Sequence, residues 1–271
     1  MSGAGAKNPA GYRDLPFALP QVEAGEKRRA KRLLKALQER YPDAKCALNY
    51  STPHELLVAT ILSAQTTDAA VNKATPALFE KFPTPKAFAE AAPEEIQPYI
   101  QSLGFFRNKA KAIHLAMKDV VERFGGDVPR TMDELLSLHG VARKTANVVL
   151  GNAFGINDGF VVDTHIERLS KRFGLAPKDA TVAMVERHLA ARFPRDEWMH
   201  LSHMLISHGR GPCKARGAAC GTDEICRKFC PDPESLCSNA VVKEKKTGAK
   251  KKTKKKAVKK TAKKKARTAK K

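Results

Sequence analysis

The feature that most constrains this chain is the stretch 131–163, which reads TMDELLSLHGVARKTANVVLGNAFGINDGFVVD. Thr131 and Glu134 form a capping box, which predicts the start of a short apolar helix. A tight turn at 139–142 leads directly into a second helix, whose first turn is basic and begins at Arg143. Backbone N–H groups at a helix N-terminus bind phosphate. Two helices joined in this way indicate contact with a nucleic-acid backbone.

Lys144 and Asp163 are the candidate catalytic residues of this stretch. The N-terminus of a helix carries a partial positive charge, so an ammonium is disfavoured at Lys144. A neutral lysine amine is a nucleophile that can form a Schiff base. Asp163 begins a further helix and would supply an acid/base group if the fold brings it near Lys144. From the residues alone, two other roles are open: Lys144 could bind phosphate, and Asp163 could serve only as a helix cap.

The pattern along the chain is that of an all-α protein. Apolar residues recur at helical spacing, and no window alternates as a strand would. No apolar run reaches the about 18 residues of a membrane span. The N-terminus has no secretory signal, so we expect a cytoplasmic protein with reduced thiols. The predicted helices include 23–40, 52–62, 109–124, 164–173, 178–193 and 196–208.

The segments LHGVARKTANVVL and VVDTHIERL resemble the helix-hairpin-helix DNA glycosylase/lyases, and the endonuclease III family in particular. ILSAQTTDAAVNKAT at 61–75, SLGFFRNKA at 102–110 and the cysteines at 213–237 agree with this family. The resemblance implies a monomeric bacterial enzyme of the nucleoid that binds double-stranded DNA containing damaged bases or abasic sites. It would remove oxidised pyrimidines, with Lys144 attacking the sugar and Asp163 assisting.

The same resemblance implies a two-lobed fold, a six-helix bundle lobe and an iron–sulfur lobe with DNA between them. Parts of the chain before and after the bundle would combine to form the second lobe. The expected parts are a flexible arm at 1–20, an iron–sulfur lobe from 21–43 plus 158–240, a bundle at 44–157 with the hairpin at 131–154, and a disordered tail at 241–271.

An enzyme that acts on a base must evert it from the duplex and fill the gap. The resemblance assigns Gln65 to the orphaned partner base and Phe105 to the wedge, where the family usually has leucine. From the residues alone, Gln65 could be a helix cap and Phe105 a core aromatic. In the hairpin, Gly140, Ala142 and Arg143 are the candidate DNA-binding residues.

The hairpin departs from the family pattern at two positions. The family normally has proline where this chain has His139, and glycine where it has Ala142. If the second position requires a positive φ, alanine there costs about 1 kcal/mol. We therefore expect a slightly re-angled hairpin with a weaker hold on phosphate.

Five cysteines within 213–237 indicate a metal centre in a reducing compartment. The endonuclease III resemblance favours a [4Fe–4S] cluster, although only the first gap of the family spacing matches. Cys230-Pro-Asp-Pro-Glu-Ser-Leu-Cys237 looks like the family's last pair with one extra residue. The predicted ligands are Cys213, Cys220, Cys230 and Cys237. The alternatives are Cys226 in place of Cys230, and zinc in place of the cluster.

The tail carries most of the excess positive charge of the chain. Residues 243–271 contain 16 lysines, Arg267 and one glutamate, a charge of +16 out of the total of +22. Such a segment cannot build a core and is expected to bind nucleic acid without regard to sequence.

Two other functions remain as alternatives for the whole chain: a monofunctional glycosylase of the same fold, which would not need Lys144, and a non-catalytic architectural DNA-binding protein.

Overall fold

The computed structural model describes residues 14–232, and in this part of the chain all regular structure is helical, as predicted. Cys237 and the Lys-rich tail lie outside the described residues. The helices are α1 (Ala24–Arg40), α2 (Pro53–Leu62), α3 (Asp68–Lys81), α4 (Pro85–Glu90), α5 (Pro93–Ile100), α6 (Phe106–Phe124), α7 (Met132–Leu136), α8 (Arg143–Phe154), α9 (Thr164–Arg172), α10 (Val182–Arg192), the 3₁₀ turn η1 (Arg195–Glu197), α11 (Trp198–Arg210) and α12 (Glu224–Phe229).

Several helices begin where local capping chemistry predicts, whereas the helix predicted for 178–193 begins later, at Val182, after the N-cap Thr181. The hydroxyl of Thr52 accepts a hydrogen bond from the backbone N–H of Glu55, and Thr131 accepts one from Glu134. Each bond satisfies an amide that the first helical turn leaves without a partner. The helix predicted to begin at Lys109 starts earlier, at Phe106, and ends as predicted at Gly125, which has a φ of +65°.

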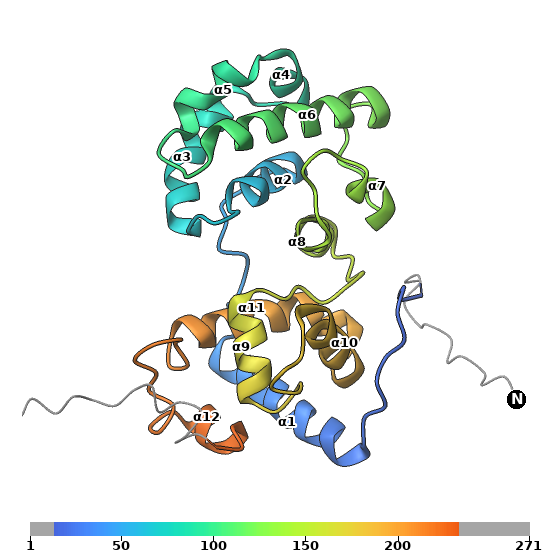
Figure 1. Ribbon diagram of the computed structural model, residues 1–271, viewed down its shortest axis with the longest axis vertical. Coiled ribbons are helices and arrows are strands. Elements are labelled where there is room, and N and C mark those ends of the chain that lie inside the picture. The colour runs from blue at the N-terminus through green and yellow to red at the C-terminus, as the bar shows by residue number, and fades with distance from the viewer. Residues whose placement is uncertain (1–13, 233–271) are drawn as a thin grey trace, which may run out of the picture. The chain divides into compact units, whose positions relative to one another are not determined.

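Buried apolar side chains form two clusters. One cluster draws its residues from the chain between Leu48 and Leu150 and packs α2–α8 together. The other combines Ala30 to Leu37 of α1 with residues from Phe160 onward, including four cysteines. Figure 1 shows α2–α8 in its upper part and α1 and α9–α12 in its lower part. The lobe boundaries proposed from the sequence stay a prediction.

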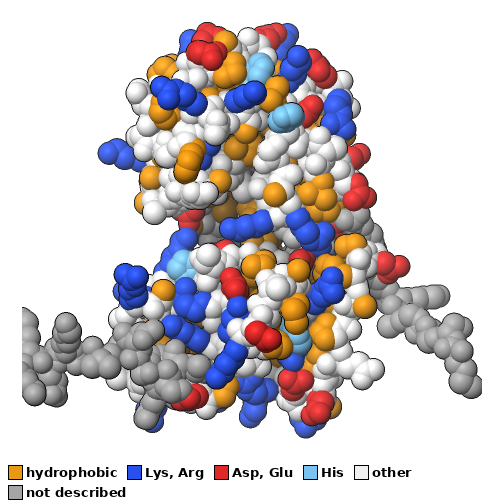
Figure 2. All heavy atoms as spheres, viewed as in Figure 1, with side chains coloured by type: hydrophobic (Ala, Val, Ile, Leu, Met, Phe, Trp, Pro, Cys, Tyr) orange, Lys and Arg blue, Asp and Glu red, His pale blue; other side chains and the backbone are white. Residues whose placement is uncertain are grey.

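The junction between these two groups of helices is hollowed on the face shown in Figure 2, where lysine and arginine side chains gather along its edges. Within residues 14–232, no helix is both long and apolar enough to cross a membrane. The cavity described next is lined by residues from both groups of helices.

Candidate active site

The cavity has a volume of about 330 Å³ and brings Lys144 and Asp163 together in its wall. Its lining comes from the loop before α2, the end of α2 and the loop after it, the start of α3, the segment before α9, and one face each of α8 and α11. A volume of this size lies within the range of small-ligand sites. The structure thus brings into one cavity the two residues that the sequence predicted to act as a pair, although they come from different helices.

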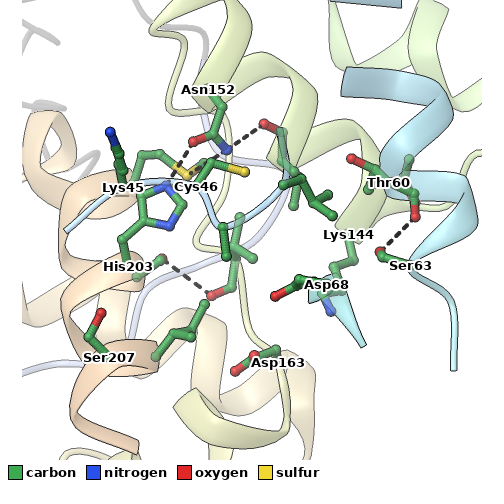
Figure 3. A pocket seen from close by; sticks show the side chains of 18 of the residues that line it. Lys45, Cys46, Thr60, Ser63, Asp68, Lys144, Asn152, Asp163, His203 and Ser207 are labelled. Carbon is green, nitrogen blue, oxygen red and sulfur yellow. Dashed lines mark hydrogen bonds between the residues drawn. The ribbon is translucent and has the colours of Figure 1, made fainter. Parts of the chain in front are cut away.

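Lys144 owes its position to the start of α8. Ala142 is the N-cap, in an extended conformation, and no side chain caps the helix there. The first amides of α8 are therefore left for a ligand, as is usual where a helix N-terminus binds an anion. Figure 3 shows the amine of Lys144 directed toward the part of the cavity where Asp68 and Asp163 lie.

Asp163 is held in place as the N-cap of α9. Its Oδ1 accepts a hydrogen bond of 2.8 Å from the backbone N–H of Ile166. The capping role that the sequence left as an alternative is therefore real, and it does not exclude a catalytic one, because a carboxylate has a second oxygen and further lone pairs. The cap fixes the orientation of the carboxylate beside the cavity.

A second carboxylate, Asp68, belongs to the same wall. It lies at the start of α3 and accepts a hydrogen bond of 2.5 Å from Arg210, at the end of α11. This ion pair joins the two groups of helices across the cavity edge. Arg210 balances the charge of Asp68. Asp163, the other carboxylate of this wall, forms no salt bridge with any residue in 14–232.

Gln65 and Phe105 share an unusual backbone conformation. They are the non-glycine residues with positive φ among residues 14–232, at +53° and +58°. For a bulky side chain this conformation costs on the order of 1–3 kcal/mol and is found mainly at functional sites. Both side chains are exposed, Phe105 to 64%. The alternative of a core aromatic at Phe105 is therefore wrong.

Lys109, which the sequence analysis did not single out, connects the two loops that carry these residues. Its side chain is buried, and its Nζ donates a hydrogen bond of 2.6 Å to Thr66, the neighbour of Gln65. Its own amide bonds to the carbonyl of Phe105. Burial lowers the pKa of Lys109. The buried side chain of Lys109 therefore links the loop that carries Gln65 to the loop that carries Phe105.

In the hairpin, the expected strain at Ala142 is absent. Ala142 has a φ of −94°, which any residue adopts, so it carries no strain there. The positive φ of the turn, +73°, belongs to Gly140, where an added Cβ would lie 3.1 Å from Ala112. The backbone N–H of His139 donates to Asp119, a bond that proline cannot make. The hairpin is thus anchored through the very residue that departs from the family pattern.

Arg143 makes contacts within the protein. Its guanidinium pairs with Glu186 of α10 at 3.0 Å and lies over the ring of Phe17. These contacts join the start of α8 to α10 and to the segment before α1. A phosphate contact through Arg143 stays a prediction, whereas the backbone amides of the turn remain suited to it.

Four cysteines of the predicted cluster are buried in the second hydrophobic core: Cys213, Cys220, Cys226 and Cys230. The sulfur atoms of Cys213 and Cys220 are 3.5 Å apart, and Cys213, Cys226 and His208 form a group whose ligand atoms all lie within 4.8 Å of one another. Cys226, which the sequence analysis placed in an insertion, thus lies beside Cys213. Asp223 caps α12 through the amide of Cys226, which positions this residue.

The chemistry of this donor set fits a metal centre. A hydrogen bond with Cys226, assisted by Arg172, lowers the pKa of Cys213 to about 6, so this thiol readily becomes the thiolate that binds iron or zinc. The same pairing raises the pKa of Cys226. The Sγ of Cys230 donates to the carbonyl of Arg172, which places it next to the same arginine.

Two further lining residues escaped the sequence analysis, Asn152 of α8 and His203 of α11. Asn152 follows Lys144 by eight positions, so both lie on one face of α8 together with Val148. That spacing was visible once α8 was predicted. Nothing in the sequence indicated that His203 faces this helix, because the contact depends on how α11 packs.

The chain matches a family model described as the HhH-GPD superfamily base excision DNA repair protein over residues 58–195. Endonuclease III of Synechocystis sp. is 50% identical over 212 residues, which cover 78% of this chain and 96% of that protein. Endonuclease III of Escherichia coli K12 is 41% identical over 203 residues, 73% of this chain and 95% of that protein.

Solved structures agree with these relatives. A trapped endonuclease III–DNA covalent intermediate and a non-covalent endonuclease III–DNA complex each align with a TM-score of 0.73 and 40% identity, over 79% of this chain and 98% of the other. The fold, the lysine and aspartate that line one cavity, and these relatives lead to one conclusion. The chain belongs to the endonuclease III family of HhH-GPD proteins, the DNA glycosylases and AP lyases of base excision repair.

Proposed function

We propose that this protein removes oxidised pyrimidines, such as thymine glycol, from double-stranded DNA and then cleaves the abasic strand by β-elimination. The observation that carries the proposal is the presence of Lys144 and Asp163 in the wall of one cavity. A monofunctional glycosylase would not need the amine, and an architectural protein would need neither the amine nor the cavity. The partner is damaged or abasic DNA in the bacterial nucleoid, bound by one copy of the chain.

In the proposed reaction, the amine of Lys144 attacks C1′ of the damaged nucleotide. The bond from Nζ to C1′ forms while the glycosidic bond breaks, and the base leaves with the electron pair of that bond. Asp163 stabilises the positive charge that develops on the sugar and accepts the proton that the amine releases. The C1′–O4′ bond then breaks as O4′ takes a proton, here the one that Asp163 accepted, which opens the sugar and leaves a Schiff base between Nζ and C1′. This Schiff base acidifies C2′, and loss of a C2′ proton expels the phosphate on the 3′ side.

The strained loops support the eversion step. Phe105 presents an exposed ring that can stack between base steps, and Gln65 presents an amide that can bond to the orphaned base. Lys109 ties the two loops through Thr66, so that both residues enter the duplex as one unit. The amides at the start of α8 and the Gly140 turn would hold the phosphates nearby.

The metal centre is proposed to be a [4Fe–4S] cluster. The endonuclease III relatives and the group of buried thiols support it. Cys213, Cys220, Cys226 and Cys230 would be the ligands, because all four are buried in one core. The cluster would fix the loop between α11 and α12, and with it the basic side chains of that loop.

Borohydride trapping tests the proposed function. Wild-type protein on duplex DNA containing thymine glycol should give a covalent protein–DNA adduct, since reduction converts the Schiff base into a stable amine. Lys144→Ala should give no adduct while binding the same DNA. Lys45→Ala, which removes another cavity lysine, is the matched control and should still trap. Failure of the wild-type protein to trap on either thymine glycol or abasic DNA would point to a non-catalytic binder.

A further inference from the structure

The cavity extends well beyond the catalytic pair, along α8 and α11. Lys144, Val148 and Asn152 line it at intervals of four residues, and the helical rise places Asn152 about 12 Å from Lys144 along the axis of α8. His203 faces Asn152 from α11. Such a length leaves room for a sugar at Lys144 and a base between it and the Asn152–His203 pair.

The hydrogen bonds of Asn152 determine which of its side-chain atoms faces His203. The Nδ2 of Asn152 lies 2.8 Å from the carbonyl oxygen of Val148. A carbonyl oxygen only accepts, so the amide nitrogen must be the atom on that side. The Oδ1 of Asn152 is thereby turned to the Nε2 of His203, at 2.7 Å.

This arrangement fixes the tautomer of His203. Because Oδ1 of Asn152 can only accept, Nε2 of His203 must carry the hydrogen. Burial, and to a lesser degree the charge of His200, lowers the pKa of His203 to about 4, so that the ring is neutral near pH 7. The Nδ1 atom then holds a lone pair and acts as an acceptor only. Figure 3 shows one ring nitrogen at Asn152 and the other directed away from it.

We propose that Nδ1 of His203 is a specificity-determining acceptor that binds an N–H group of the everted base. The favoured substrates are pyrimidine lesions that retain the imide N3–H, the thymine- and uracil-derived ones, because an acceptor of fixed tautomer pairs with a donor and repels another acceptor. Asn152 is the positioning residue that holds the tautomer. This inference rests on the proposed glycosylase function and names its substrate class.

Comparing a base-containing and a base-free substrate tests the proposal. His203→Leu should slow single-turnover excision of thymine glycol by about 10- to 100-fold, the usual effect of removing a hydrogen-bond partner from a buried site. Cleavage of abasic DNA should change less than about threefold, because that substrate has no base to contact. His188→Leu, the same change on a partly exposed histidine of α10 that does not line the cavity, should leave both rates unchanged.

A second measurement tests whether the N3–H group of the base is the donor to His203. Wild-type protein should excise 5,6-dihydrothymine faster than its N3-methyl derivative by about tenfold or more, and His203→Leu should lose most of this preference. An equal loss of thymine glycol and abasic-site activity in His203→Leu would overturn the inference, and so would an N3-methyl preference that the variant retains. Absence of abasic-site cleavage in the wild-type protein would instead overturn the proposed function.

Discussion

At the scale of single residues, backbone strain identifies the candidate duplex-inserting groups. Phe105 adopts a left-handed conformation and exposes a large aromatic ring, two features that stability alone would not favour. Gln65 has the same conformation at the end of α2. Sequence motifs placed both residues at helix junctions, but only the structure distinguishes an exposed Phe105 from a core aromatic.

Replacing Phe105 tests this assignment. Phe105→Ala should lower single-turnover excision of thymine glycol from duplex DNA by about 5- to 100-fold, since stacking of a base on an aromatic ring contributes about 1–3 kcal/mol. Excision from single-stranded DNA should change much less, because no gap needs filling. Met184→Ala, at another exposed apolar side chain, is the control and should retain full activity. A loss of equal size on both DNA forms would argue against the wedge.

At the scale of elements, the short helix α12 makes Cys226 a further candidate among the cluster ligands. The sequence spacing favoured Cys230 and Cys237 and left Cys226 in an insertion. The cap by Asp223 and the contact of Cys226 with His208 instead bring this thiol into the group with Cys213. Spacing alone could not decide this, because a one-residue change in a loop alters which thiols converge.

Iron content distinguishes the two ligand sets. Cys226→Ser should reduce iron and sulfide per chain and the visible absorbance of the purified protein, because one thiolate of the cluster is lost. Cys237→Ser should leave all three unchanged. Cys46→Ser, at a partly buried thiol outside the cluster, serves as the control. The opposite result, full iron in Cys226→Ser and loss in Cys237→Ser, would restore the ligand set predicted from spacing.

At the scale of the whole molecule, the candidate active site is assembled from distant parts of the chain. The cavity wall takes residues from 45–68, 144–163 and 199–210, and the Asp68–Arg210 pair joins the first and last of these. The chain also carries +16 of its +22 formal charge in residues 243–271, outside the described residues. On the proposed function, the cavity would carry out the chemistry and the charge of residues 243–271 would add non-specific attraction to DNA.

Deleting residues 243–271 should therefore change DNA affinity more than chemistry. The slope of the logarithm of the binding constant against the logarithm of salt concentration should become shallower, because fewer counterions are released on binding. Single-turnover excision at saturating protein should stay nearly intact. A charge-neutral replacement of the tail by Gly and Ser of equal length controls for size. An unchanged salt slope would show that the tail is not part of the DNA-binding surface.

The sequence by itself determined the all-helical class, many of the helix starts and the candidate catalytic residues. Helix starts depend on contacts within about four residues, such as those of Thr52, Thr131 and Asp163 with their own first turns, so local pattern is enough. Lys144 and Asp163 could be named because they lie at such starts within recognisable segments. The all-helical fold followed from the same local rules.

Only the tertiary structure decided how these parts meet. The acceptor at His203 depends on a bond to Asn152, 51 positions away, and the tie at Lys109 on Thr66, 43 positions away. Contacts of this kind arise from helix packing, in which the free energy depends on the shape of whole buried surfaces and not on any local signal. Helix packing decides the tautomer of His203, the exposure of Phe105 and the proximity of Cys226 to Cys213.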